Sequence, residues 1–217
     1  MKILHLFSDW KWTGPAEPAL NLCVELKKRG HDVTFACGKA MDDYPFPPDS
    51  ESIEKSAYER GLVPVTRFHL SKHFSFFKYI SDIKNLSVFM NEEAYDIVHV
   101  HRNQGHLVGG MAARRTGRSL PIVRTNHDGV ALKKNLRNKK CLTRLTDRLI
   151  EVSEEARVAD MNSFGLSEDK TIMINASIDC QRFNPGSGPL THRQKFGMKE
   201  DDIVVGIIAR IQTHRRF

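Results

Sequence analysis

The stretch Met1–Val33, MKILHLFSDWKWTGPAEPALNLCVELKKRGHDV, decides the fold of this 217-residue chain. It begins with a short apolar run at residues 2–7, which is followed by a polar loop at residues 8–15. Residues 17–29 have the pattern of a helix, and a second apolar run follows at residues 32–37. This order predicts a βαβ unit, in which the helix connects two parallel strands.

The helix at residues 17–29 is predicted from its apolar spacing and from the residues near its ends. Pro18 falls in the first turn, where its missing N–H has no helical partner, and Gly30 suits a left-handed C-terminal cap. One face of this helix should therefore lie on a sheet. That face carries, at positions i, i+3, i+4 and i+7, the residues Ala19, Leu22, Cys23 and Leu26.

The loop at residues 8–15 should lie at the carboxyl edge of the sheet, where ligands of open α/β sheets bind. It has a single glycine, Gly14, and so is not a GxGxxG phosphate-binding motif. Asp9, Trp10 and Trp12 are candidates for a ligand-facing surface, because amphipathic rings suit a sugar or a lipid head group. The alternative is an ordinary loop with two partly packed tryptophans.

Strands and helices continue to alternate along the chain, which predicts an α/β fold with a Rossmann-like parallel sheet flanked by helices. Gly109 and Gly110 lie inside one predicted helix, where they allow a close approach to the sheet. Further strands are predicted at residues 62–68, 96–101, 121–125, 148–152 and 170–175, and further helices at 51–60, 76–90, 107–115, 132–146 and after Ser153.

A polar cluster, NHDG at residues 126–129, directly follows the predicted strand at 121–125. A strand holds such side chains rigidly while the loop opens to solvent, so the cluster is a candidate binding or catalytic site. His99 and His101 alternate on another predicted strand and should share one of its faces. The histidines form no HExxH or similar ligand pair, and we expect no metal.

The charge of the chain is unevenly distributed, although the formal net charge is only +7. Residues 114–148 contain eleven lysines and arginines against two aspartates, so the remainder is slightly acidic. Such a segment could meet the phosphates of a sugar nucleotide or an anionic membrane surface, or it could be a solvated face without a partner. It lacks interleaved aromatic residues, so we expect no nucleic-acid partner.

Composition also bears on location. The chain has no run of 18 apolar residues and no signal-peptide pattern, and its four cysteines form no CxxC pair. Free thiols suit a reducing compartment, so we expect a cytoplasmic protein, with room for peripheral contact at the inner face of a membrane. Most aromatic residues at 76–90 should be core, but Phe74, Phe77 and Phe89 are neighbours of lysines and are candidates for lipid contact.

Length and composition predict one full domain followed by the start of a second. Residues 1–185 form the predicted Rossmann-like domain, and residues 186–202 contain a Gly/Pro/Ser linker and a short helix. Residues 203–208 are an uninterrupted apolar run, which is typical of a strand buried on both faces. We therefore expect residues 203–217 to be the first strand of a second domain that has been cut away.

Six short motifs, in order along the chain, resemble the landmarks of glycosyltransferase family 4. They are KRGHDV at 28–33, DIVHVH at 96–101, RTNHD at 124–128, IEVSE at 150–154, INASID at 174–179 with FNP at 183–185, and VGIIAR at 205–210. Together they span nearly the whole chain. The resemblance implies a GT-B fold, with this chain as the N-terminal, acceptor-binding half and the first strand of the donor-binding half.

The resemblance also implies a retaining transfer of sugar from a nucleotide-sugar donor to a glycan or lipid acceptor, without a cofactor. Gly14 would approach the donor phosphates, and His127 would lie near the transferred sugar with Asp128 beside it. Arg210 and Arg215 would neutralise the diphosphate leaving group, although Arg215 stands where the family has a lysine. The acceptor-side candidates are Asp9, Trp10, Trp12 and His101.

Half of a two-domain cleft would be absent from this chain, so we expect the fragment alone to be inactive. A nucleotide-sugar 2-epimerase of the same fold is a second interpretation, and it would need no acceptor. A non-catalytic module that binds an anionic membrane through residues 114–148 is a third. A role in polysaccharide or cell-envelope synthesis follows from the resemblance alone.

Overall fold

The computed structural model of the chain describes residues 1–39, 52–181, 183–184, 193, 195–199 and 201–207. The chain divides into two compact units, residues 1–177 and residues 178–217. The strands and helices named below all belong to the first unit. The first unit is therefore the part of the chain on which a binding site can be built.

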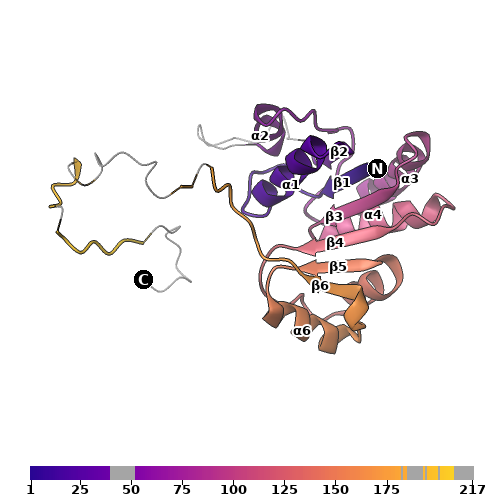
Figure 1. The fold of residues 1–217 in the computed structure, drawn as a ribbon. Coiled ribbons are helices and arrows are strands. Elements are labelled where there is room, and N and C mark those ends of the chain that lie inside the picture. The colour runs from indigo at the N-terminus through magenta and orange to yellow at the C-terminus, as the bar shows by residue number, and fades with distance from the viewer. Residues whose placement is uncertain (40–51, 182, 185–192, 194, 200, 208–217) are drawn as a thin grey trace. The chain divides into compact units, whose positions relative to one another are not determined.

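A six-stranded parallel sheet forms the centre of the first unit, in the order β2-β1-β3-β4-β5-β6 (Figure 1). The order changes direction between β1 and β3, and open α/β sheets bind ligands at such a switch point. The predicted Rossmann-like α/β fold is confirmed. The strands are β1 (Lys2–Phe7), β2 (Asp32–Cys37), β3 (Ile97–His101), β4 (Ile122–Asn126), β5 (Arg148–Glu151) and β6 (Thr171–Met173).

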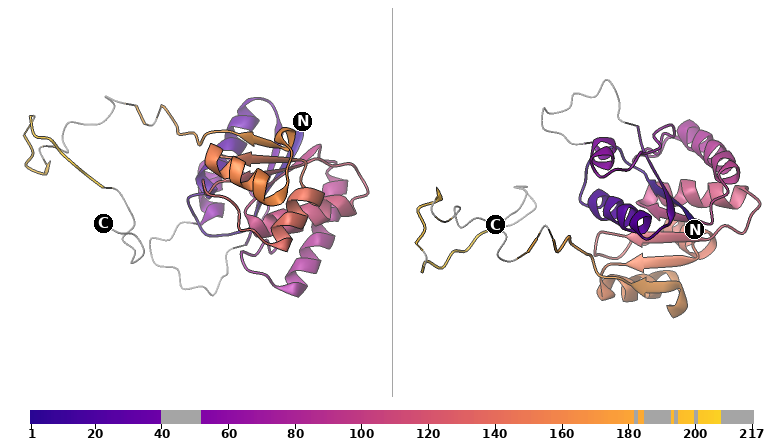
Figure 2. Two further views of the ribbon diagram at one scale, coloured as in Figure 1. Left: turned by 90° about the horizontal axis from the view of Figure 1, so that it is seen from below. Right: turned by 45° about the horizontal axis from the view of Figure 1, so that its top comes forward.

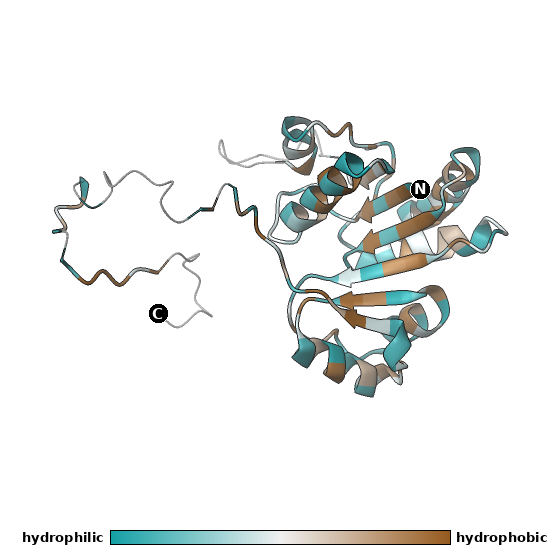
Figure 3. Ribbon diagram, viewed as in Figure 1, coloured by the Kyte–Doolittle hydropathy of each residue, from teal (hydrophilic) through white to brown (hydrophobic). Residues whose placement is uncertain are grey.

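Helices cover both faces of the sheet (Figure 2). They are α1 (Ala16–Lys28), α2 (Ile53–Glu59), α3 (Phe76–Glu92), α4 (Asn103–Arg115), α5 (Leu136–Lys140) and α6 (Glu154–Phe164), with a π-helical turn η1 (Cys141–Leu145) and a 3-10 turn η2 (Glu168–Lys170). Leu4 and Leu6 of β1 belong to an apolar cluster with α3 and α4, whereas Phe7 packs with α1 and α2. Alternate residues of a strand point to opposite faces, so each face has its own core. Much of the length of the strands is accordingly hydrophobic (Figure 3).

Two glycines act as the sequence predicts. Gly30 follows α1 with φ +82°, a conformation that favours glycine, and it ends the helix expected at residues 17–29. Gly109 lies where α4 approaches the sheet closely. A Cβ at this position would be 2.6 Å from Leu6 Cδ1 and 2.9 Å from Val100 Cγ1. The predicted close approach of this helix is therefore confirmed.

Two predictions of secondary structure in the first unit are wrong. Residues 62–68 form no strand, and Val65 makes only an isolated bridge to Ala36. Pro64 explains the difference, because proline has no N–H to donate to a strand ladder. The helix expected at residues 132–146 begins later, as α5, and changes to the π-helical turn η1.

Of the three phenylalanines proposed for lipid contact, Phe89 is misassigned. It is only 7% exposed and packs in the cluster with α3 and α4, whereas Phe74 and Phe77 are 59% and 83% exposed. Residue 89 falls on the face of α3 that meets the sheet, because it is one turn from the buried Leu86. Within the described ranges, no helix has the length and apolar character needed to cross a membrane.

The described residues of the second unit form no strand. Residues 203–207, predicted as the start of a buried strand, are extended without ladder partners, and Ile203 and Val205 are 95% and 90% exposed. A parallel strand needs neighbours for its backbone hydrogen bonds, and none among the described residues pairs with this segment. Residues 208–217 lie outside the described part. The division into residues 1–185, 186–202 and 203–217 stays a prediction.

Candidate functional site

Three loops meet at the carboxyl edge of the sheet, around the switch point between β1 and β3. Ser8 follows β1, Arg102 follows β3, and His127 and Asp128 follow β4. The N–H of Gly105 in the first turn of α4 donates to Ser8 Oγ at 2.8 Å, which fastens the start of α4 to the end of β1. Residues that are about a hundred positions apart are thereby brought into one site.

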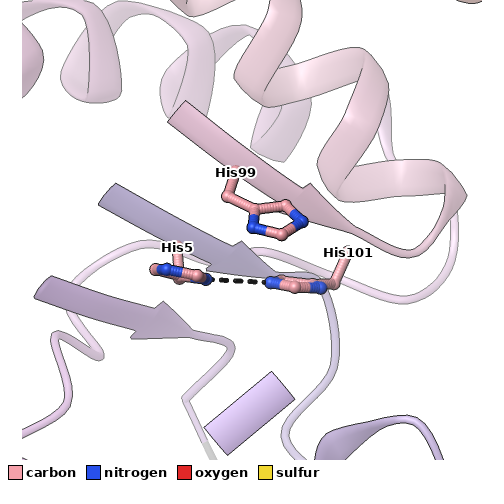
Figure 4. Close-up of side chains that lie close together, drawn as sticks. All are labelled: His5, His99 and His101. Carbon is pink, nitrogen blue, oxygen red and sulfur yellow. Dashed lines mark hydrogen bonds between the residues drawn. The ribbon is translucent and has the colours of Figure 1, made fainter. Parts of the chain in front are cut away.

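Four histidines lie in and beside this edge, and three of them form a hydrogen-bonded row: His5, His101 and His127. His5 of β1 and His99 and His101 of β3 lie on one face of the sheet, as predicted for the latter two (Figure 4). His5 Nδ1 is 3.1 Å from His101 Nε2, and His101 Nδ1 is 2.9 Å from His127 Nε2. His99 Nε2 instead lies 2.7 Å from Thr125 Oγ1. A hydrogen-bonded chain therefore leads from β1 to His127.

The histidines of this row are neutral at neutral pH, because burial disfavours the charged ring. Burial lowers the pKa of His5 to about 3, and burial with the charge of Arg124 lowers the pKa of His127 to about 4. Burial and neighbouring rings lower the pKa of His101 well below 6.5. A neutral ring has one N–H, so the hydrogen bonds between His5, His101 and His127 all run in the same direction. The tautomer of His127 is coupled to those of the other two.

His5, His99 and His101 also qualify as a group of metal ligands, since their ring nitrogens lie within 4.8 Å of one another. The rings of His99 and His101 are stacked, with 4.4 Å between their centroids, whereas the ring of His5 is tilted by 41° to that of His99. Nitrogen lone pairs lie in the ring plane, so the stacked rings of His99 and His101 do not aim their nitrogens at one ion about 2 Å away. The geometry favours a hydrogen-bonded row, and the expectation of no metal stays a prediction.

A buried carboxyl pair supports the loop that carries His127 and Asp128. Asn126 Nδ2 donates to Glu151 Oε2 and to the carbonyl of Val130, both at 2.9 Å. Burial, followed by the hydrogen bond and charge of Asp160, raises the pKa of Glu151. Glu151 Oε1 and Asp160 Oδ2 otherwise have no hydrogen-bond partner within the described residues, so a proton shared between the two carboxyls satisfies both.

A cavity of about 400 Å³ opens at the same edge. Four cationic side chains line it, and they come from four separate segments of the first unit: Lys72 before α3, Arg102 before α4, Arg124 on β4 and Arg137 on α5. Asp128 is the carboxylate that lines it. The site therefore combines the predicted Asp128 with a concentration of positive charge.

Arg124 is the most deeply buried of these cations, with 3% of its surface exposed. Its Nη2 donates to Asn103 Oδ1 at 3.1 Å, whereas Nε and Nη1 have no hydrogen-bond partner in the described part of the chain. Burial lowers its pKa to about 10, against the opposite effect of Asp128, so the guanidinium remains charged at neutral pH. Two buried donor nitrogens without hydrogen-bond partners lower the stability of the folded protein unless a bound molecule supplies acceptors for them.

Asp9, an acceptor-side candidate, lies behind the cations and does not line the cavity. Its Oδ1 accepts from the backbone N–H groups of Trp10 at 2.9 Å and Lys11 at 3.2 Å. Its Oδ2 is 3.7 Å from Arg102 Nη2 and 3.9 Å from Lys72 Nζ. Asp9 therefore shapes the loop after β1 and positions two of the cations.

The other predicted residues either do not line the cavity or lie outside the described part. Trp10 and Trp12 each have a cationic side chain 4.9 Å from a ring centroid, and neither ring lines the cavity. Gly14 is exposed in the loop before α1, and a Cβ added there would meet no atom of the described residues within 4 Å. Arg210 and Arg215 fall among the residues that the structure does not describe. Their proposed roles stay predictions.

Sequence patterns did not single out the cationic residues of the cavity. Arg124 stands in the RTNHD motif and Arg137 in the basic segment, but neither was distinguished from its many charged neighbours. Lys72 and Arg102 carry no local signal of this kind. Arg102 has φ +70°, which is uncommon for a residue with a side chain and is often found at functional sites, and only the structure reveals it.

Comparison with known proteins identifies the family. The model of Glycosyltransferase Family 4 matches residues 13–182, which is most of the chain. The chain belongs to glycosyltransferase family 4. One curated relative in this comparison is a D-inositol 3-phosphate glycosyltransferase of Thermobifida fusca, 26% identical over 132 residues, which cover 55% of this chain and 30% of the relative.

A second relative of this family 4 chain is an Escherichia coli UDP-Gal:alpha-D-GlcNAc-diphosphoundecaprenol alpha-1,3-galactosyltransferase. It is 24% identical over 152 residues, which cover 65% of this chain and 39% of that protein. The chain thus spans only about a third of the length of these relatives.

Solved structures show the same fold. A glycosyltransferase from Rickettsia africae superimposes with a TM-score of 0.72 at 14% identity, over 92% of this chain and 50% of that one. A UDP-N-acetylglucosamine 2-epimerase has a TM-score of 0.63 at 15% identity, over 89% of this chain and 54% of that one. The family 4 chain has the Rossmann-like fold of one half of a GT-B protein, and at these identities the likeness shows the fold alone.

Proposed function

We propose that this chain is the acceptor-side domain of a retaining glycosyltransferase, which moves a hexosyl group from a nucleotide sugar to a glycan or lipid-linked acceptor. The observation that carries the proposal is a cationic cavity at the switch point of the sheet, which Asp128 lines and which the adjacent residue His127 does not line. Membership of family 4 supports the class of reaction. The wider role that fits is polysaccharide or cell-envelope synthesis.

The charges of the reaction suggest how the residues act. Breaking the bond between an anomeric carbon and a diphosphate makes the sugar more positive and the leaving phosphate more negative. His127 is neutral and held by His101, so it can make a fixed hydrogen bond to the sugar without adding positive charge beside it. Asp128 can accept a hydrogen bond from a hydroxyl. Arg210 and Arg215 remain the proposed partners of the diphosphate.

The test is acceptor-dependent release of nucleoside diphosphate by the protein that contains this chain, supplied with a panel of nucleotide sugars and membrane glycolipid extracts. The His127→Ala variant should lose about 100-fold in kcat, the range found when one positioned transition-state contact is removed. His31→Ala is the matched control, because His31 lies between α1 and β2 at the other end of the sheet. Unchanged activity of the His127→Ala variant would contradict the assignment.

The same assay separates the transferase from the epimerase interpretation. A 2-epimerase would convert its nucleotide sugar into an epimer without an acceptor and would not release nucleoside diphosphate in step with a glycosylated product. The fold is shared by both classes of protein and does not decide between them. Acceptor-independent epimerisation would replace the transferase proposal.

The 217-residue chain by itself is proposed to be inactive. The cavity belongs to the first unit, and a transferase of this fold closes its cleft with a second domain that binds the donor. Purified chain should therefore show no sugar transfer under conditions in which the longer protein is active. Detectable transfer by the chain alone would contradict this part of the proposal.

Peripheral attachment to the cytoplasmic face of a membrane is the proposed location. Phe74 and Phe77 are exposed near the start of α3, and Lys78 follows them, as suits an anionic surface. Co-sedimentation with phosphatidylglycerol vesicles should fall for a Phe74→Ser, Phe77→Ser double variant, whereas Val63→Ser should bind as the parent does. Equal sedimentation of all three proteins would rule out membrane contact through Phe74 and Phe77. Charge reversal in residues 133–140 tests the basic segment in the same assay.

A further inference from the structure

We propose that the cationic cavity binds a phosphate group of the acceptor, which makes the acceptor of this protein a phosphate ester. This proposal rests on the proposed transferase function only where it assigns the phosphate to the acceptor. The anion site itself stands on the geometry of the first unit. Arg124, Arg102, Lys72 and the start of α4 carry the argument.

Arg124 provides the first evidence for an anion site. It is almost completely buried, it lines the cavity, and two of its three nitrogens have no hydrogen-bond partner within the described residues. The third nitrogen donates to Asn103 Oδ1, which holds the guanidinium in place. A planar guanidinium presents its free N–H groups as a fork that matches two oxygens of one phosphate.

The N-terminus of α4 provides the second evidence for an anion site. This helix has 13 residues, and the side chain of its N-cap residue, Arg102, makes no capping hydrogen bond, although Ser8 Oγ accepts from the N–H of Gly105. Asn103 and Gln104, its first two residues, line the cavity. Free N–H groups and the helix dipole make this end of a helix favourable for an anion. The preceding residue, Arg102, has φ +70°, so its backbone is held in an uncommon conformation at the mouth of the site.

The balance of charge is the third reason, and it favours phosphate over a carboxylate. Among the described residues, Arg102, Arg124, Arg137 and Lys72 line the cavity together with one carboxylate, that of Asp128, which is exposed. Asp9 approaches Arg102 and Lys72 from behind the cavity and does not line it. The cavity thus offers more donors, from more directions, than the two oxygens of a carboxylate can accept, whereas a phosphate ester has three terminal oxygens.

The placement of the cavity assigns this phosphate to the acceptor. The lining residues that the structure describes lie in the first unit, between Ser8 and Arg137. Gly14, the described residue that is expected at the donor diphosphate, is not among the lining residues. The cavity volume of about 400 Å³ accommodates a phosphate together with part of the group that carries it.

Binding of glycerol 3-phosphate to the 217-residue chain, followed by titration calorimetry, tests the site without requiring sugar transfer. Saturable binding is expected, and Arg102→Gln should weaken it at least about tenfold, as the loss of one charge-assisted contact does. Arg115→Gln is the matched control, because Arg115 is exposed at the far end of the same helix. It should bind as the parent does. Arg124→Gln should also weaken binding, and Arg102→Gln keeps the test valid if that variant does not fold.

Two results would overturn the inference. One is the absence of saturable binding, or equal binding by the Arg102→Gln and Arg115→Gln variants. The other is displacement of glycerol 3-phosphate by UDP, with UDP binding that depends on Arg102 in the same way. This result would show that the cavity binds the donor phosphates. Inorganic phosphate is titrated in parallel, and tighter binding of the ester than of the free ion supports an acceptor ester, whereas the reverse order contradicts it. The transferase proposal fails separately, through the activity of the His127→Ala variant.

Discussion

Mild acid should destabilise this protein strongly, because its fold keeps several histidines uncharged. His5, His99, His101 and His106 are buried, and burial lowers the pKa of each of them. In the unfolded chain the same rings take up protons as the pH falls through about 6.5. Below that pH the unfolded state binds more protons than the folded state, so the free energy of unfolding falls.

The size of the effect follows from the pKa of His5, which burial lowers to about 3. At about pH 5 the unfolded ring is protonated and the folded ring is not, and the difference is worth about 2 kcal/mol. Burial lowers the pKa of His99, His101 and His106 in the same direction, so each adds to this loss, and a typical domain has a stability of only about 5–15 kcal/mol. Acid unfolding is therefore expected between about pH 5 and 6.

Urea unfolding, followed by the fluorescence of Trp10 and Trp12 from about pH 7.5 down to about pH 5, measures this loss. The slope of the unfolding free energy against pH is about 1.4 kcal/mol per pH unit for each extra proton bound by the unfolded chain. His5→Gln keeps a polar partner for His101 and should reduce the uptake by about one proton. His73→Gln is the control, because the His73 side chain is exposed and its replacement removes no buried ring.

Two outcomes would refute this reasoning. The unfolding free energy could stay constant across the acidic range, which would mean that the rings take up protons in the folded state. Alternatively, His5→Gln and His73→Gln could change the slope equally, which would mean that burial of His5 has no part in it.

Three further predictions concern packing, charge and a helix end. Gly109→Ala should lower the unfolding free energy by about 1–3 kcal/mol in urea titrations despite the better helix propensity of alanine, because its Cβ would lie 2.6 Å from Leu6 Cδ1; an unchanged midpoint would contradict the close approach. The raised pKa of Glu151 means that the folded parent holds a proton that the unfolded chain releases, so the parent loses stability as the pH rises. Glu151→Gln has no such proton and should gain stability relative to the parent as the pH rises. Parallel profiles of unfolding free energy against pH would contradict a raised pKa of Glu151. Ser153→Ala should cost about 1 kcal/mol in thermal unfolding, because Ser153 Oγ caps α6 through the Ala156 N–H, and no loss would mean that water replaces the cap.

The order and type of most elements could be predicted from local sequence, because each rests on neighbours along the chain. The apolar spacing in residues 17–29 predicts α1, and Gly30 marks its end. The alternation at residues 96–101 places His99 and His101 on one face of β3. The misassigned segment at 62–68 shows the limit, since Pro64 prevents a ladder that the apolar pattern alone would allow.

The sequence by itself determined the parallel α/β fold, the family, and the placing of NHDG at a strand end. Only the tertiary structure decided which side chains meet there. His5, His101 and His127 join into one row, and Arg102 and Arg124 line one cavity, because β1, β3 and β4 lie side by side. Strand order depends on long-range pairing, and no short stretch of sequence encodes the distance between residues that only the folded sheet brings together.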